Sequence, residues 1–312
     1  MQTETPLFLL GGADSSGTTL VASVLDGLAD IRTGPETWLF HHRALYTTPA
    51  ADFQRLVYTL LTRGGADIGM VVDRLKVSLC PGGLFKHRDA YGFQEEDEYD
   101  LLCASTSLEA YVSAVLSRLD APRPVAFLDQ TPANAVAARE YLERFPQGRF
   151  IHVLRDGRDV VASLLGRWSR EAPGHPDATY LTGAAVNWSW DVSQALRARG
   201  LPGYLEVRYE AFVRDPLGQT NRILAHLGRP QVSAADFAAN RDRQRAAAMR
   251  WGEKPSWGST PDQPITDRSV GRWRQRYSPD TEAQLRTIRY TIAEDGPRPY
   301  VFGDVLQQAG YG

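Results

Sequence analysis

The first residues of this chain that could perform chemistry lie between an apolar run and a helical pattern. Gly11 and Gly12 follow the apolar run Phe8–Leu10. The small polar residues Ser15 to Thr19 come next and lead into apolar residues at helical spacing. Glycines let the backbone turn sharply and bring its N–H groups close to an anion, and the N-terminus of a following helix adds a favourable dipole. The pattern predicts a strand, a phosphate-binding loop and a helix.

This loop differs from the loop of an ordinary nucleoside triphosphatase. Gly12 and Gly17 have the spacing of a Walker A motif, and Thr19 stands where such a motif holds Mg²⁺. The position that should be lysine is Thr18. A P-loop kinase-like enzyme, in which Asp129 would be a second Mg²⁺ ligand, is therefore an alternative only. A second alternative is that this stretch is an ordinary glycine-rich turn between a strand and a helix.

Basic residues after another apolar run indicate a second phosphate-binding element. Residues 149–154 have the composition of a strand, and Arg155 follows directly. In the helix expected next, Asp159, Ser163 and Arg167 are four residues apart and share a face. Two guanidinium groups and a hydroxyl could together bind one phosphate. The alternative is a set of surface arginines in ion pairs.

The elements that must position these residues alternate between strands and helices. Strands are expected at the apolar run before Gly11 and at residues 125–129, 149–154 and 204–209. Helices are expected at residues 16–29, 52–63, 97–119, 133–144, 159–168, 182–199, 216–228 and 281–293. This alternation predicts an α/β fold of the P-loop NTPase type, with a mainly parallel central sheet flanked by helices and with long substrate and lid loops.

We expect a single domain over residues 1–312 and a lid loop within it. Residues 240–279 are rich in Arg, Gly, Pro, Ser and Trp and show little periodicity. Loops of this length in compact domains usually bind or enclose a ligand. A surface insertion without such a role is the alternative.

Composition excludes several classes of protein. A net charge of −2 gives no general attraction for nucleic acid or for an anionic membrane. The first residues lack the basic leader of a signal peptide and no apolar stretch is long enough to span a bilayer, which predicts a cytoplasmic protein. Cys80, Cys103 and the six histidines show no metal-binding spacing, so no metal is expected. The oligomeric state is left open.

Four motifs in chain order resemble those of the sulfotransferases that use 3′-phosphoadenosine-5′-phosphosulfate (PAPS). They are Ser16-Gly17-Thr18-Thr19, Arg155-Asp156-Gly157-Arg158 through Ser163, Val207-Arg208-Tyr209-Glu210 and Gly271-Arg272-Trp273. The resemblance implies that the loop Ser15 to Thr19 binds the 5′-phosphosulfate and that Arg155 and Ser163 bind the 3′-phosphate. It places Arg167 as a further phosphate contact and Tyr209 near the nucleotide. Gly271, Arg272 and Trp273 would close over PAPS.

In motif detail the chain is most similar to the tyrosylprotein sulfotransferase branch. Leu25-Asp26 and Gly34-Pro35-Glu36-Thr37 carry this resemblance, and the matching glutamate of that branch is catalytic. The resemblance implies that Glu36 is the general base that takes a proton from an acceptor hydroxyl. The expected reaction is sulfuryl transfer from PAPS to a hydroxyl of a small molecule or carbohydrate. A salt bridge from Glu36 to Arg32 is the alternative role.

Two positions depart from the family pattern, and both lack an expected cation. Ser15 replaces an arginine or lysine before Ser-Gly-Thr-Thr, and Gln130 replaces a lysine in an Asp-Lys-Thr-Pro segment. Cations there would stabilise the departing phosphate. Substitutes could come from the loops, at Lys76, Lys254, Arg268 or Arg272. Alternatively, the chain has lost PAPS chemistry and uses a 3′-phosphonucleotide such as coenzyme A for another reaction or for regulation.

Overall fold

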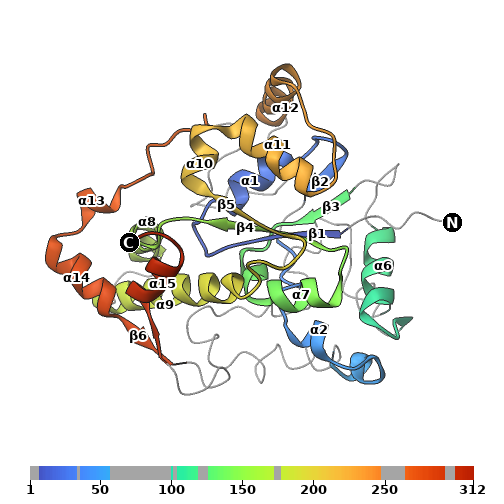
Figure 1. Cartoon of the computed structure of the whole chain (residues 1–312), viewed down its shortest axis with the longest axis horizontal. Helices are drawn as coiled ribbons and strands as arrows, with labels where there is room; N and C mark the ends of the chain where they lie inside the picture. Colours follow the sequence, from blue (N-terminus) through green and yellow to red (C-terminus); the bar gives the residue numbers. More distant parts are fainter. Residues whose placement is uncertain are drawn as a thin grey trace.

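A five-stranded sheet forms the centre of the protein (Figure 1). The computed structural model describes residues 7–33, 36–56, 100, 104–118, 126–171, 177–246, 264–291 and 299–312. The strand order is β2-β3-β1-β4-β5, and every neighbouring pair is parallel. The strands are β1 (Leu7–Gly11), β2 (Ile31–Thr33), β3 (Ala126–Asp129), β4 (Arg149–Leu154) and β5 (Tyr204–Arg208). The predicted α/β fold with a parallel sheet is confirmed.

The loop after β1 lies at the topological switch point of the sheet, where the strand order reverses direction. β1 is the central strand, with β3 on one side and β4 on the other. The chain visits β2 and β3 first and then crosses to β4 and β5. Open parallel sheets bind ligands at the carboxyl ends of their strands at such a switch point. The fold therefore places the predicted phosphate loop at the position where a ligand is expected.

Helices cover both faces of the sheet, as Figure 1 shows. Successive residues of β1 point to opposite faces, since Leu9 belongs to one buried cluster and Leu10 to another. The helices that pack on the Leu10 face are α1 (Thr18–Leu25), α10 (Tyr209–Arg214) and α11 (Pro216–His226). Those on the other side include α7 (Ala138–Arg144), α8 (Gly157–Glu171), α9 (Asp177–Leu196), α14 (Pro279–Thr287) and α15 (Phe302–Gln308). The short elements are α2 (Ala44–Thr47), η1 (Ala50–Asp52) and η3 (Pro132–Ala137).

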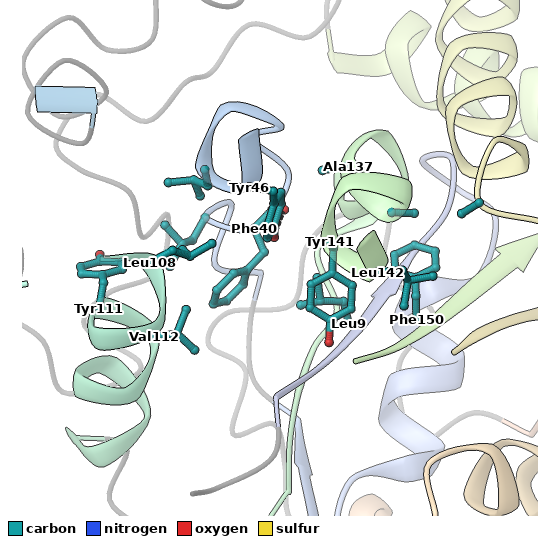
Figure 2. Close-up of a cluster of buried hydrophobic side chains, with 14 of the residues drawn as sticks. Leu9, Phe40, Tyr46, Leu108, Tyr111, Val112, Ala137, Tyr141, Leu142 and Phe150 are labelled. Atoms are coloured by element: carbon teal, nitrogen blue, oxygen red, sulfur yellow. Dashed lines mark hydrogen bonds between the residues drawn. The ribbon is translucent and has the colours of Figure 1, made fainter. Parts of the chain in front are cut away.

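The cluster on the Leu9 face fixes the segment that follows Glu36 (Figure 2). Phe40 and Tyr46 pack there with residues of α7 and of α6 (Leu108–Arg118). The Tyr46 hydroxyl donates a hydrogen bond of 2.7 Å to the Phe40 carbonyl. Because these rings are buried, the chain just after Glu36 is held by the core on one side.

Several helices begin or end at other residues than the sequence predicts, for local reasons. The first helix begins at Thr18, not Ser16, because Gly17 has a left-handed backbone (φ 101°), and it ends before Asp26, which is extended. Within the helix expected at 97–119, residues 100 and 104 are helical, residues 105–107 are not, and α6 begins at Leu108. The Ser107 hydroxyl accepts the N–H of Ala110 there, as a capping residue does. The helix expected at 133–144 is a 3₁₀ turn followed by α7.

The helix predicted at residues 281–293 is present as α14 but ends earlier, and it is not the last helix. α14 ends at Thr287, and β6 (Arg289–Tyr290) then pairs antiparallel with β7 (Tyr300–Val301). α15 follows and buries Phe302 and Leu306. The start of α14 follows local signals, since the Ser278 side chain accepts the N–H of Thr281. Its end depends on the pairing with β7, which the local sequence does not indicate.

The first part of the expected lid, residues 240–279, is helical. α12 (Ala234–Ala246) includes Asn240 and Gln244, whose side chains donate to backbone carbonyls at the end of α1. α13 (Trp273–Arg276) lies near the other end of the stretch. Residues 247–263, Lys76, Cys80, Cys103 and most of the helix expected at 52–63 lie outside the described residues. No helix in the described ranges has the length and apolar character needed to cross a bilayer.

We predict that two buried histidines make the protein unstable in acid. Burial lowers the pKa of His152, in β4, to about 3 and that of His42 to about 4. Both histidines are therefore neutral in the folded state at pH 5, whereas the unfolded chain binds protons from about pH 6.5. Stability is complete above that pH and falls below it, by about 1.4 kcal/mol per pH unit for each histidine. Urea unfolding of His152→Gln and His42→Gln between pH 7 and pH 4.5 should show a shallower loss than the parent, and an unchanged slope would contradict the assignment.

Candidate functional site

The loop between β1 and α1 packs tightly against β4. A Cβ atom on Gly12 would lie 2.4 Å from the carbonyl oxygen of Val153 and 2.7 Å from the hydroxyl of Ser16, so only glycine fits. Ser15 has a left-handed backbone (φ 63°), as does Gly17. Thr18 begins α1, and its hydroxyl-bearing side chain is buried. The loop is therefore a sharp turn that ends at a helix N-terminus, as predicted from its glycines.

Tyr209 lies directly against this loop. A Cβ atom on Gly17 would lie 2.5 Å from the Tyr209 ring, which comes from the first residue of α10. The Tyr209 hydroxyl is 2.6 Å from the hydroxyl of Ser269, in the stretch expected to form the lid. The structure thus brings together three predicted segments: the phosphate loop, the end of β5 and the lid.

Arg155 is the central cation of the site. Its Nη1 donates to the carbonyl of Ser15 at 2.9 Å, and its Nη2 donates to the carbonyl of Ser269 at 2.8 Å. The guanidinium also lies 4.5 Å from the centre of the Tyr209 ring. The residue is buried, with 7% of its surface exposed. A single side chain at the end of β4 therefore connects the phosphate loop to the lid segment.

The other two predicted phosphate ligands lie on α8. Ser163 is exposed, and Arg167 follows one turn later with 14% of its side chain exposed. An Arg167 nitrogen is 3.7 Å from a carboxylate oxygen of Asp14, in the phosphate loop. Arg167 is thus in an ion pair, and its partner belongs to the loop that was predicted to bind the phosphosulfate.

Asp159 anchors the Gly271-Arg272-Trp273 segment. One carboxylate oxygen accepts the N–H of Gly271 at 2.6 Å, and the other accepts the N–H of Trp273 at 3.0 Å. The guanidinium groups of Arg158 and Arg274 lie 4.2 and 4.8 Å from the centre of the Trp273 ring. Helical spacing places Asp159 on the same helix face as Ser163 and Arg167. The structure assigns it to the lid segment instead, and sequence spacing alone carried no signal for this pairing.

Glu36 is held by the indole of Trp38. The Trp38 Nε1–H donates to Glu36 Oε2 at 2.8 Å, and the Glu36 side chain is partly exposed. The backbone N–H of Trp38 donates to the hydroxyl of Thr131 at 3.1 Å, in the segment after β3. The sequence predicted Glu36 at this edge of the sheet but gave no role to Trp38.

Asp129 is a structural residue of the turn after β3. Its Oδ1 accepts the N–H of Thr131 at 3.1 Å and the side-chain amide of Asn134 at 2.6 Å. Burial raises the pKa of this carboxyl, which disfavours the charged form that Mg²⁺ would need. In the described residues no group of three or more His, Cys, Asp or Glu side chains could hold a metal ion. The geometry of Asp129 favours its role as a turn residue over the kinase alternative.

Buried polar atoms without partners mark where an anion would fit. In the described part of the chain, the Ser16 hydroxyl, Arg155 Nε and Gln130 Oε1 are buried and have no hydrogen-bond partner. Such groups are costly unless a ligand or water satisfies them. Two of the three are donors beside the N-terminus of α1. The two donors, on Ser16 and Arg155, fit a phosphate-bearing ligand. The unpartnered Gln130 atom is an acceptor and stands where a cation was expected.

The sequence matches the model of the sulfotransferase family over residues 6–233. Human protein-tyrosine sulfotransferase 1 is 27% identical over 164 residues, which are 52% of this chain and 34% of that protein. Protein-tyrosine sulfotransferase 2 of Gallus gallus is 24% identical over 234 residues, 72% of this chain and 52% of that protein. The chain thus spans between a third and about half of the length of these relatives.

Solved structures share the fold. The sulfotransferase domain of the olefin synthase of Synechococcus PCC 7002 has a TM-score of 0.53 at 20% identity, over 91% of this chain and 95% of that domain. A mouse sulfotransferase complexed with PAP has a TM-score of 0.51 at 13% identity, over 91% of this chain and 82% of that one. At these identities the likeness shows the fold alone.

Proposed function

Because the chain belongs to the sulfotransferase family, we propose that it transfers the sulfuryl group of PAPS to a hydroxyl group of a small-molecule or carbohydrate acceptor. The observation that carries this proposal is Arg155, which is buried at the end of β4 and reaches both the phosphate loop and the lid segment. The similarity of the chain to a sulfotransferase complexed with PAP and to protein-tyrosine sulfotransferases supports PAPS as the donor.

The donor would bind along the carboxyl edge of the sheet. Ser15, Ser16, Gly17, Thr18 and Thr19 would offer N–H and hydroxyl groups to the 5′-phosphosulfate at the N-terminus of α1. Arg155 would bind the 3′-phosphate with Ser163 and Arg167. Tyr209 would lie beside the nucleotide, since its ring already contacts Gly17. Gly271, Arg272 and Trp273, held by Asp159, would close the site.

Glu36 would act as the general base at the acceptor side. The acceptor oxygen forms a bond to sulfur while its proton moves to the Glu36 carboxylate, and the bond from sulfur to the bridging oxygen breaks. The electron pair of that bond leaves with adenosine 3′,5′-bisphosphate (PAP). The role of this chain is to hold the proton acceptor near the reacting oxygen and to stabilise the charge on the departing phosphate.

The lid would supply the cation that Ser15 and Gln130 lack. Arg268 precedes Ser269, which contacts Arg155 and Tyr209, so its backbone lies at the donor site. Arg272 lies between two residues that Asp159 anchors. Both arginine side chains are exposed in this structure. Lys254 and Lys76 remain further candidates outside the described residues.

Ser15 and Gln130 also favour a second candidate function. A sulfotransferase-fold protein without these cations could bind a 3′-phosphonucleotide such as coenzyme A for another reaction or for regulation. The 3′-phosphate site around Arg155 would serve equally in that case. Donor binding and sulfuryl transfer must therefore be tested separately.

The donor is tested by thermal unfolding with competing nucleotides. PAP should raise the melting temperature more than AMP or ATP with Mg²⁺, because neither of these carries the 3′-phosphate that Arg155 would bind. PAP should also exceed coenzyme A, which has the 3′-phosphate but carries pantetheine on its 5′-diphosphate. A ligand at one hundred times its Kd stabilises by about 2.7 kcal/mol. Greater stabilisation by coenzyme A would favour the second candidate, and greater stabilisation by ATP with Mg²⁺ would favour a kinase.

We predict that Gly17→Ala weakens PAP binding about tenfold, because the new methyl group must displace the Tyr209 ring. Gly200→Ala is the matched control, since Gly200 also has a positive φ (90°) but has no atom within 4 Å of an added Cβ. Both variants place a side chain on a residue with positive φ, which lowers the free energy of unfolding by about 1 kcal/mol in each. Calorimetry should show weaker PAP binding in Gly17→Ala only; equal loss in both would contradict the contact with Tyr209.

A further inference from the structure

We propose that Trp38 is a positioning residue for the reaction, which holds the Glu36 carboxylate in the orientation that accepts the proton. This inference rests on the proposed function, because it gives Glu36 the role of base. The juxtaposition that carries it is the indole N–H of Trp38, which donates to Glu36 Oε2 at 2.8 Å.

The backbone of Trp38 is held on both sides of the residue. Its N–H donates to the hydroxyl of Thr131 at 3.1 Å, and Thr131 is fully buried in the segment after β3. The next N–H along the chain, that of Leu39, donates to the hydroxyl of Thr37 at 3.2 Å. Leu39 and Phe40 then enter the buried cluster of Figure 2. The indole is therefore attached to a rigid part of the molecule.

Trp38 also has a backbone conformation that is unusual for its residue type. Its φ is 57°, in the left-handed region, where a bulky side chain costs about 1–2 kcal/mol. Such strain persists only where surrounding contacts determine it, and it is frequent at functional sites. Here the left-handed turn lets residues 36 and 38 meet through their side chains, although they are only two positions apart.

The indole hydrogen bond has two physical consequences for Glu36. A hydrogen bond to a carboxylate stabilises its charged form, which is the form that accepts the proton. It also restricts the orientation of the carboxylate of a partly exposed side chain. Catalysis depends on such positioning, since misplacement by about 1 Å can cost about 100-fold in rate. Trp38 would thus act on kcat through Glu36 without touching the acceptor.

The variant Trp38→Phe tests this role because it keeps an aromatic ring and the same backbone cost but lacks the N–H. We expect kcat to fall about 10- to 100-fold with little change in KM, and the acidic limb of the pH–rate profile to move to higher pH because the hydrogen bond to the charged carboxylate is lost. Trp190→Phe is the matched control. Trp190 is buried on α9, and its Nε1 has no partner among the described residues. An unchanged profile in Trp38→Phe would overturn the proposal.

A second measurement uses the parent protein and needs no activity. In ¹H–¹⁵N spectra, one indole resonance should shift in the acidic range as Glu36 titrates, and this shift should vanish in Glu36→Gln. If no indole resonance titrates in this way, the positioning role is wrong even where Trp38→Phe does not fold. If Glu36→Gln kept the activity of the parent, Glu36 would not be the base, even though the indole resonance of the parent protein still titrated. The two failures are therefore distinguishable.

Discussion

Arg155→Ala should weaken PAP binding about 100-fold. The guanidinium is the buried cation at the end of β4, and its charged hydrogen bonds to a 3′-phosphate are expected to contribute about 3 kcal/mol. Its removal also frees the carbonyls of Ser15 and Ser269, which it now holds together. The free energy of unfolding should therefore fall as well, by about 1–3 kcal/mol. Isothermal titration calorimetry measures the affinity, and urea unfolding measures the stability.

Arg149→Ala separates these two effects. Arg149 begins the same strand, and its guanidinium also donates to backbone carbonyls, those of His226, Gln147 and Gly148. It lies at the opposite edge of the sheet from the phosphate loop. This variant should lose stability but keep the PAP affinity of the parent. Parent-level PAP binding in Arg155→Ala would refute the assigned 3′-phosphate site.

Glu36→Gln should lower kcat by about 10²- to 10⁴-fold, the range that a general base contributes. The amide keeps the shape of the side chain but cannot take the proton of the acceptor hydroxyl. PAP affinity should stay at the parent value, because Glu36 lies outside the elements proposed to bind the donor. Steady-state kinetics and calorimetry on the same preparation make the comparison.

The matched control for this variant is Glu143→Gln. Glu143 is an exposed acid on α7 that pairs with Arg139 four residues earlier. Exposed pairs of this kind contribute little, so activity and PAP binding should both be unchanged. A loss of PAP affinity in Glu36→Gln equal to its loss of kcat would show that Glu36 supports the structure of the site instead of the chemistry.

Features with local signals could be predicted from the sequence. The strand expected at residues 149–154 is β4 with the same bounds, because its apolar run ends at a charged turn. The helix expected at residues 216–228 is α11, which begins at Pro216, and the Asp215 side chain just before it accepts the N–H of Gly218. The sharp turn between β1 and α1 was also predicted from its glycines. In each case the residues that decide the structure are neighbours in the chain.

Features that depend on distant partners could not be predicted. Asp159 and Gly271 are 112 residues apart, and no periodicity connects an aspartate on a helix to the N–H of a later glycine. Trp38 and Thr131 are 93 residues apart, so the anchor of the Glu36 segment was equally hidden. α14 ends where β6 begins to pair with β7. These contacts arise from the packed fold, which places separate loops at one edge of the sheet.

Transfer of label from PAPS tests the central claim most directly. The parent protein is incubated with PAPS that carries a sulfur isotope and with a broad pool of hydroxyl acceptors, and the products are followed by mass spectrometry. We expect labelled sulfate esters and an equal amount of PAP from the parent. Alanine variants at Lys254, Arg268 and Arg272 should identify the lid cation by a loss of about 3 kcal/mol in transition-state stabilisation. The claim would be contradicted if the parent made no labelled product while Ser15→Arg/Gln130→Lys sulfated the same acceptors.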